Sequence, residues 1–252
     1  MPIVTEYLIR EGLTRLGLSA GSTALVHSSL SNFGHVEGGA DAVIDALLGV
    51  IGPAGTILVP TLTGNENLSP ENPPVFDPVN TPCWTGRIPE TFRKRPDAIR
   101  SVHPTHSVAA IGADAMELTR DHILSITPCD EFSPYGKLAR REDGYILLIG
   151  VDHDVNTTMH HVEEIAGVDY HMQRGFAEST LIINGTKIIR HYMLHRYGAA
   201  RNFSVMGPIF VERGIQWSTR IGDADVHLIQ AKPMVEITCQ CLRANPRILY
   251  RE

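Results

Sequence analysis

The sequence predicts one α/β domain with a largely parallel sheet and an antiparallel extension. Strand-like and helix-like segments alternate in the first half of the chain. The segment GYILLIGV at 144–151 is almost continuously apolar, as is typical of a central strand covered on both faces. Asn184-Gly185 separates two strand-like runs, which indicates a hairpin. Because no clean linker divides the chain, we expect a single domain over residues 1–252 rather than two domains.

The elements before residue 62 follow the order helix, strand, helix, strand. Apolar residues within 4–16 are spaced as on one face of an amphipathic helix. TALVHS at 23–28 is apolar enough for a buried strand, and the apolar residues of 40–51 form one helical face that a Gly-Pro pair ends. TILVPT at 56–61 is the next strand. Strand, helix and strand in this order predict a βαβ unit.

The remaining elements follow a long polar loop at 62–86. A loop of this length inside a compact domain is typical of functional or mobile segments. After it we predict, in order, a helix at 88–95, a strand at 107–112, a helix at 113–121, the central strand at 144–151, the hairpin at 180–193, a helix at 206–213, strands at 215–222 and 225–230, and a closing helix at 231–242.

Composition excludes several classes of protein. Hydrophobic residues make up 43% and charged residues 20%, which argues against disorder. The formal net charge is −6 and there is no long basic run, so nucleic-acid binding is disfavoured and a cationic partner is favoured. No stretch approaches the roughly 18 apolar residues of a membrane span, and the N-terminus lacks the apolar core of a secretory signal. We therefore expect a cytoplasmic protein that binds neither membranes nor nucleic acid.

The four cysteines show no CxxC spacing and no regular framework. They are expected to be free thiols in a reducing compartment, and they are Cys83, Cys129, Cys239 and Cys241.

The segment VHSSLSNFGHVEGGADAV at 26–43 joins a strand to a helix through a turn rich in Ser and Gly. Such a junction offers free backbone N–H groups and the positive end of a helix dipole, which suit an anionic ligand such as the pyrophosphate of CoA. A plain connection with serine caps is the alternative. The segment is not a P-loop, so ATP is not indicated.

Two further segments contain histidines next to strands. RSVHPTHSVAAIG at 100–112 precedes a strand, where its histidines and serine either bind phosphate or hold a loop in place. GVDHDVNTTMHHVEE at 150–164 follows the central strand, and ligands of open α/β sheets gather at the carboxyl ends of strands. Asn156 or Thr157 can cap a helix there, on which His160 and Glu163 share a face. Imidazoles exchange protons near neutral pH, so this pair is either a catalytic base with its partner or a solvated surface pair.

Together, these segments resemble the aminoglycoside 3-N-acetyltransferase family. The similarity covers about residues 5–230. The matching stretches are VHSSLSNFG, GGADAVIDAL, GPAGTILVPT, FDPVNTPCWTGRIPETFRKRPDAIRSVHPTHSVAAIG, CDEFSPYGKL and GYILLIGVDHDVNTTMHHVEE.

The resemblance implies a fold, an activity and partners. The fold would be a three-layer α/β/α arrangement with a central mostly parallel sheet, unlike the GNAT acetyltransferases. The activity would be transfer of the acetyl group of acetyl-CoA to the 3-amino group of a 2-deoxystreptamine aminoglycoside, which inactivates the antibiotic. Acetyl-CoA would be the co-substrate, the aminoglycoside a cationic partner, and no metal would be needed. The protein would be a monomer or a homodimer.

The resemblance also assigns roles to residues. The D-x-N-T-x-x-H-x-x-E pattern of the family makes His160 the base, with Glu163 and Asp154 as acidic site residues. Asn156 and Glu164 would contact the substrate. The pantetheine channel would be lined by His27, Ser28, Ser29, Leu30 and Phe33, and the CoA phosphates would be held by His103 and Ser107.

The sequence departs from the family after the hairpin. Many members carry a Trp-x-Glu stretch whose acid supports the catalytic histidine. Aligned from Asn184-Gly185, this position falls at about His191, and no acid lies within 187–196. We therefore expect Glu163, or else Asp154, to orient His160.

Direct transfer in a ternary complex is favoured, because no cysteine lies in these motifs. Backbone N–H groups near Ser28–Leu30 are the expected oxyanion site. One alternative is a CoA-binding relative that acetylates another amine or performs no catalysis. Another is a metal-dependent hydrolase, but its candidate ligands His153, Asp154, His160 and His161 form adjacent pairs rather than an HExxH pattern. The loops at 62–86 and 196–206 would decide which acceptors are accepted.

Overall fold

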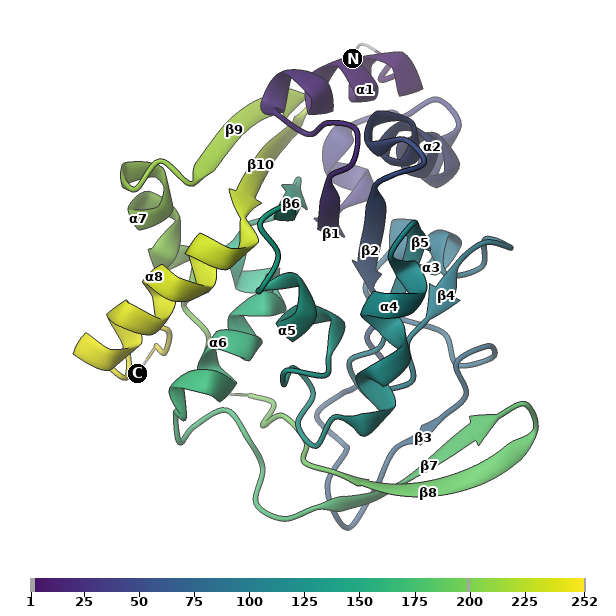
Figure 1. Ribbon diagram of the computed structural model, residues 1–252, viewed down its shortest axis with the longest axis vertical. Coiled ribbons are helices and arrows are strands. Elements are labelled where there is room, and N and C mark those ends of the chain that lie inside the picture. Colours follow the sequence, from purple (N-terminus) through teal and green to yellow (C-terminus); the bar gives the residue numbers. More distant parts are fainter. Residues whose placement is uncertain (1–2, 199, 252) are drawn as a thin grey trace.

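The computed structural model describes residues 3–198 and 200–251 (Figure 1). Its strands are β1 Thr23–Ser28, β2 Thr56–Pro60, β3 Val75–Phe76, β4 Ile99–Arg100, β5 Val108–Gly112, β6 Gly144–Ile149, β7 Ala177–Ile183, β8 Thr186–Tyr192, β9 Gln216–Ile221 and β10 Ala224–Gln230. Its α-helices are α1 Glu6–Leu16, α2 Gly39–Ile51, α3 Arg87–Phe92, α4 Ala115–Thr119, α5 Pro134–Leu138, α6 Thr158–Ala166, α7 Met206–Glu212 and α8 Ala231–Ala244. Short 3₁₀ helices are η1 Leu30–Phe33, η2 Arg120–Leu124, η3 His153–Val155 and η4 Phe203–Val205.

The predicted α/β class is confirmed, and parallel pairing occupies the centre of the main sheet. Within the described residues this sheet has the order β4-β5-β2-β1-β6-β10-β9. β1 pairs in parallel with β2, as the βαβ pattern predicts, and also with β6. Antiparallel strands flank this centre on both sides, so parallel pairing is less extensive than expected. β9 and β10 are joined by Gly222 and Asp223 alone, and so short a connection permits only an antiparallel pair.

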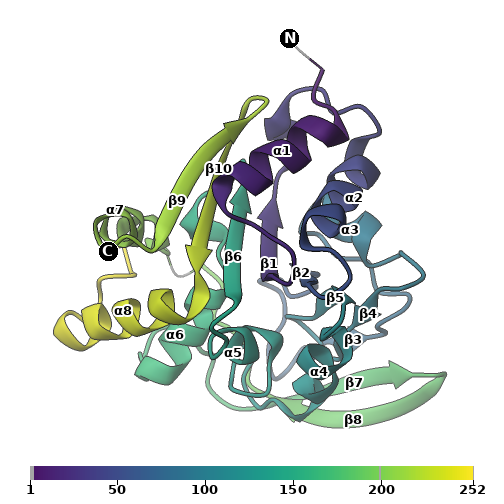
Figure 2. The same ribbon diagram turned by 45° about the horizontal axis from the view of Figure 1, so that its top comes forward.

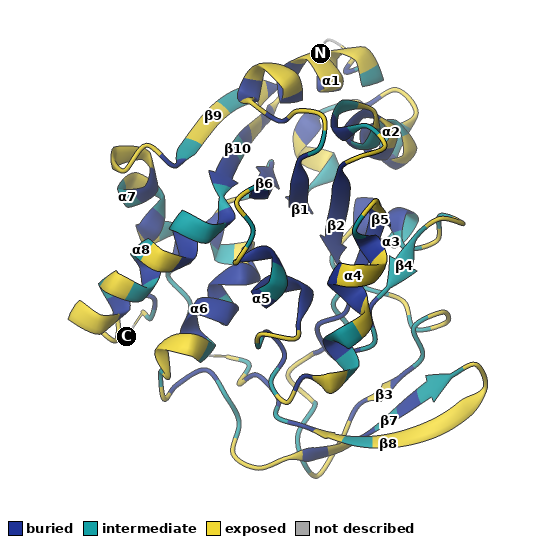
Figure 3. Ribbon diagram, viewed as in Figure 1, coloured by how far each residue is buried: buried dark blue, intermediate teal, exposed yellow. Residues whose placement is uncertain are grey.

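The core lies on both faces of the main sheet. Because successive strand side chains point to opposite faces, Val26 of β1 joins one buried cluster and Leu25 joins the other. The first cluster includes residues of α1, α2 and α3, and the second includes residues of α4, α5, α6, α7 and α8. Figure 2 shows α1 to α3 on one side of the strands, and Figure 3 shows the central strands buried. Helices thus cover both faces of the sheet.

The predicted hairpin forms, but it belongs to a separate sheet with the order β3-β7-β8 (Figure 1). Asn184 and Gly185 both adopt positive φ, 51° and 77°, as a tight turn between antiparallel strands requires. Phe76, Leu181 and Tyr192 form the small buried cluster of this sheet. Among the described helices, none combines the length and the apolar character needed to cross a bilayer.

The topology brings the three histidine- and serine-rich segments to one edge of the main sheet. β1 and β6 run in parallel, and Ser28 lies opposite Ile149 at their carboxyl ends. β5 runs antiparallel to β2, so Val108 at its start lies opposite Pro60 at the end of β2. The turn after β1, the loop before β5 and the segment after β6 therefore lie together.

Candidate active site

A cavity of about 260 Å³ lies at this edge. Its walls include His27 and Ser28 from the end of β1, Trp84 from the long loop, and His160 from α6. The same Ser28 and Trp84 also line an adjoining groove, which continues past Ser29 and Leu30. The cavity and groove thus form a continuous surface from His160 along the turn after β1.

His160 and Glu163 face each other on α6, as their spacing predicts. Nδ1 of His160 lies 2.7 Å from Oε2 of Glu163. The Glu163 side chain is fully buried, and Nε of Arg201 lies 3.7 Å from the same oxygen. Burial opposes ionisation of Glu163, but the hydrogen bond with His160 and the charges of His160 and Arg201 outweigh it and lower the pKa of this carboxyl group. The pair is therefore enclosed by protein and is not a solvated surface pair.

His27 is a neutral wall of the cavity. Its Nε2 accepts a hydrogen bond from the backbone N–H of Thr157, at 3.3 Å, which joins the end of β1 to the start of α6. Burial, together with the neighbouring His153 and His160, lowers the pKa of His27 to about 3. At neutral pH the ring of His27 is therefore uncharged.

Ser28 presents an unsatisfied hydroxyl. Its Oγ is buried and has no hydrogen-bond partner among the described residues. The amide of the next residue, Ser29, is already used, because it donates to the carbonyl of Ile149 at 2.9 Å. A buried polar atom without a partner is costly unless a ligand satisfies it. The hydroxyl of Ser28 is thus a better candidate than the Ser29 amide for a group that contacts a bound carbonyl.

The other residues expected at the CoA site lie away from the cavity and the groove. Phe33 is 1% exposed and packs in the cluster that contains α1 and α2. Nδ1 of His103 accepts the backbone N–H groups of Thr105 and His106, at 3.3 and 3.0 Å. Ser107 donates its hydroxyl to the carbonyl of Thr61 at 2.8 Å. Of the two interpretations of the HPTHS segment, these contacts favour holding a loop in place.

The residues expected to contact the substrate are Asp154, Asn156 and Glu164, and they also contact other protein groups. Asp154 lines the cavity, and its Oδ1 accepts the amide of Ser204 at 2.9 Å. Asn156 is fully buried, and its Oδ1 accepts the amide of Thr158 at 3.2 Å, which orders the start of α6. Glu164 is also buried, and burial raises its pKa to about 8. Neither Asn156 nor Glu164 lines the cavity or the groove.

The residue aligned with the acid of the family does not reach His160. His191 lies on β8 with 63% of its side chain exposed, and its nearest charged neighbour is Glu178 at 3.8 Å. His195, beyond the end of β8, lies against His160 instead, with ring centroids 4.5 Å apart. The hairpin of β7 and β8 projects from the body of the molecule (Figure 1). The chain therefore returns to the site only after β8 ends.

A smaller cavity of about 160 Å³ lies on this side of His160, and the sequence singled out few of its residues. Its lining includes His106, His160 and His195, with Arg196 and Arg201 as charged members. For the two arginines, the sequence indicated only that both lie in the loop at 196–206, which is expected to decide which acceptors are accepted. The proposed ligands of a hydrolase are not brought together, because Nε2 of His153 contacts Gln216 at 2.8 Å and Nδ1 of His161 donates to the carbonyl of Cys129 at 2.6 Å.

A family profile described as aminoglycoside 3-N-acetyltransferase matches residues 25–243. The chain belongs to this family. As a member of the aminoglycoside 3-N-acetyltransferase family, it is an acyltransferase. The matched residues include all three segments that meet at the edge of the main sheet.

Relatives and solved structures support the assignment over nearly the whole chain. Aminoglycoside N(3)-acetyltransferase VII of Streptomyces paromomycinus is 32% identical, with 92% of this chain and 89% of that protein covered. The aminoglycoside N(3')-acetyltransferase-like protein YokD of Bacillus subtilis is 36% identical, with coverage of 92% and 90%. A mutant of the aminoglycoside acetyltransferase AAC(3)-IVa solved with gentamicin has a TM-score of 0.86, 28% identity, and coverage of 100% and 93%. AAC-IIIb solved with CoASH has a TM-score of 0.83, 26% identity, and coverage of 96% and 97%.

Proposed function

We propose that this chain transfers the acetyl group of acetyl-CoA to the 3-amino group of a 2-deoxystreptamine aminoglycoside, with His160 as general base. The observation that carries the proposal is the His160–Glu163 pair, which is anchored in a buried carboxylate and opens onto the cavity beside Ser28. A buried carboxylate that orients an imidazole is the arrangement that general-base catalysis uses. Related proteins named as aminoglycoside acetyltransferases, over most of their length, support the choice of substrate class.

The surface beside His160 fits acetyl-CoA. The cavity has a largely apolar surface, which suits a pantetheine arm, and the groove that continues from it passes Ser29 and Arg87. Ser28, whose hydroxyl has no partner among the described residues, lines both the cavity and the groove. Acetyl-CoA supplies a thioester carbonyl that an amine can attack. Arg87, at the start of α3, is the cationic side chain along the groove that suits the phosphates of CoA.

Within this proposal, four residues of the site have distinct roles. Glu163 holds Nδ1 of His160, so Nε2 is the atom that takes a proton from the attacking amine. The hydroxyl of Ser28 donates to the carbonyl oxygen as negative charge develops on it. His27 stays neutral and links the two segments through the amide of Thr157. Because Glu163 is already ionised, the charge that develops on His160 meets a fixed counter-charge.

A second acceptor class is favoured by the charges on the other side of His160. The smaller cavity is lined by Arg196 and Arg201, and no carboxylate is among its described lining residues. The neighbouring Glu163 and Glu164 are buried and engaged with protein groups. Arg201 is paired with Glu163, so the exposed guanidinium of Arg196 is the charge that matters at this cavity. Beside it a polycation is disfavoured, whereas an amine that also carries a carboxylate or phosphate is favoured. Asp154 in the larger cavity is the acid that remains for an aminoglycoside.

One experiment separates these acceptors. CoA thiol release from acetyl-CoA is followed with a panel of aminoglycosides and, in parallel, with amines that carry a carboxylate or a phosphate. The main proposal expects turnover with at least one 2-deoxystreptamine aminoglycoside and a product acetylated at the 3-amino group. Turnover confined to the anionic amines would replace it by the second candidate. Failure with every amine, despite CoA binding in calorimetry, would reject acetyl transfer altogether.

A further inference from the structure

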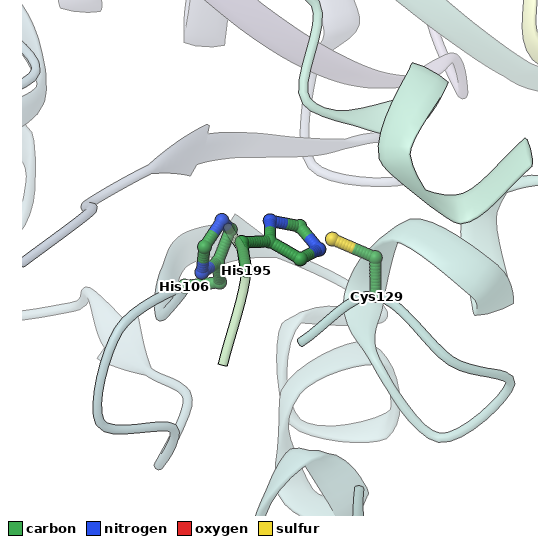
Figure 4. A group of neighbouring side chains, drawn as sticks. All are labelled: His106, Cys129 and His195. Atoms are coloured by element: carbon green, nitrogen blue, oxygen red, sulfur yellow. The ribbon is translucent and has the colours of Figure 1, made fainter. Parts of the chain in front are cut away.

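A cluster of metal-binding side chains lies behind the candidate base and has no part in the proposed chemistry. It consists of His106, Cys129 and His195, and one potential ligand atom of each lies within 4.8 Å of those of the other two. The three residues come from separate segments: the loop before β5, the loop before α5, and the loop after β8. All three are buried. Figure 4 shows the ring of His195 beside that of His106, with a ring nitrogen directed at the sulfur of Cys129.

Oxygen atoms next to the two histidines can orient their rings or add a further ligand. Nδ1 of His106 lies 2.9 Å from Oγ1 of Thr105, which leaves Nε2 for a ligand. Nε2 of His195 lies 3.2 Å from Oε1 of Glu164, so a fourth donor touches the cluster. The same Oε1 accepts the amide of Cys129 at 2.9 Å. Oxygen partners that orient histidine ligands are conserved features of metal sites in general.

We propose that His106, Cys129, His195 and Glu164 bind one divalent transition-metal ion, with Zn²⁺ as the chemical class that fits best. Two imidazoles, a thiolate and a carboxylate are donors that Zn²⁺ accepts in a closed tetrahedral site. Around zinc such donors stand about 3.3–3.6 Å apart, from bond lengths of about 2.0–2.3 Å. The ligand atoms of His106, Cys129 and His195 lie within 4.8 Å of one another, so metal binding requires these side chains to move closer together. This proposal differs from the expectation, drawn from the family resemblance, that the protein needs no metal.

The site is structural rather than catalytic. Its four donors are protein groups, so a tetrahedral ion has no open position for a substrate. It ties together three loops, and two of them carry His106 and His195 into the smaller cavity beside His160. The ring centroids of His106 and His160 are 6.3 Å apart. Metal binding thus fixes the acceptor-side wall, including the ring of His195, whose centroid lies 4.5 Å from that of His160.

The test uses Co²⁺, which takes the place of zinc and reports a thiolate ligand by a charge-transfer absorption band. The purified full chain is stripped with chelator and titrated with Co²⁺ alone. We expect one Co²⁺ per chain, an intense visible spectrum typical of tetrahedral cobalt, and displacement by Zn²⁺. Cys129→Ser abolishes the charge-transfer band. The matched control Cys241→Ser, at a half-buried free cysteine of α8, keeps it.

Two further variants keep the proposal falsifiable if Cys129→Ser fails to fold. His106→Gln and Glu164→Gln, checked by circular dichroism, each weaken Co²⁺ binding by at least about 10-fold. Metal content of the protein as purified is measured in parallel. A wild-type chain that takes up no stoichiometric Co²⁺ or Zn²⁺ would overturn the proposal. A charge-transfer band that persists in folded Cys129→Ser would overturn it as well, because the sulfur would then lie elsewhere.

Discussion

Nδ1 of His160 lies 2.7 Å from Oε2 of Glu163, and the carboxylate that it meets is completely buried. Exposed ion pairs at this helical spacing contribute little to stability and are screened by salt. A buried carboxylate instead holds the imidazole in one orientation. We treat Glu163 as a positioning residue, because it acts through His160.

Replacing Glu163 by Gln tests this positioning. Glu163→Gln keeps the shape but removes the charge, so we expect kcat to fall by up to about 10⁴-fold, the loss seen when the carboxylate of a catalytic triad is replaced by its amide. The KM for acetyl-CoA should change little, since Glu163 acts through His160 and does not line the cavity. Asp154→Asn is the comparison, because Asp154 contacts the amide of Ser204 instead. A large fall in kcat in Asp154→Asn and not in Glu163→Gln would assign the orienting acid to Asp154.

Ser28→Ala tests the oxyanion contact. The hydroxyl of Ser28 is buried and unpartnered, so its loss leaves no other protein group unsatisfied. We expect kcat to fall by about 10²- to 10³-fold, the usual cost of one oxyanion donor, with little change in the KM for acetyl-CoA. Steady-state kinetics with the best acceptor provide the measurement. Ser29→Ala is the control, since Ser29 pairs with Ser31 at 3.0 Å, and an equal loss there would remove the special role of Ser28.

Buried neutral histidines predict acid sensitivity of the fold. Burial lowers the pKa of His122 to about 4 and that of His27 to about 3. Because these folded-state values lie below the unfolded value of 6.5, their contribution to stability is present above pH 6.5 and is lost as pH falls toward 4 and 3. Each adds a slope of up to about 1.4 kcal/mol per pH unit to the free energy of unfolding.

Urea unfolding between pH 4.5 and 7 measures this slope. In His122→Gln the slope should be smaller by up to about 1.4 kcal/mol per pH unit, since glutamine does not titrate. His191→Gln is the control, because His191 is exposed on β8. A slope unchanged in His122→Gln would show that His122 is charged in the folded protein.

The organisation of the chain as a single domain stays a prediction. Tyr192 of the small sheet donates its hydroxyl to the carbonyl of Ile123, in η2 beside α4, at 3.2 Å. This contact couples the small sheet to the rest of the chain, so we expect one cooperative unfolding transition. Near-ultraviolet and far-ultraviolet circular dichroism followed together provide the measurement. Two separated transitions would indicate that the sheet β3-β7-β8 unfolds as an independent unit.

Local features of the site were predictable, and long-range ones were not. The spacing of His160 and Glu163 follows from helix geometry, and Asn184-Gly185 specifies its own turn. Burial of Glu163 depends on Arg201, which arrives from a loop almost forty positions later. Likewise, no periodicity in the sequence indicates that His195 meets His160, because the hairpin between them belongs to a different sheet.

The same distinction holds for the fold. Apolar patterns located the strands β1, β2 and β6, and they predicted the parallel pairing of β1 with β2, because a βαβ connection admits few alternatives. The flanking antiparallel strands have the same apolar pattern, so the pattern alone did not reveal their direction. For His103 and Ser107, the residue types suit a phosphate site, but the loop folds inward and their hydrogen bonds are made within the protein.

The most direct test of the account is the kinetics of His160→Ala with acetyl-CoA and the best acceptor from the panel. If His160 is the general base, kcat falls by about 10²- to 10⁴-fold while the affinity for acetyl-CoA, measured by calorimetry, stays within a few-fold of wild type. His191→Ala, at the position aligned with the acid of the family, should keep full activity. A His160→Ala variant that retains most of its kcat would contradict the assignment of His160 as the base.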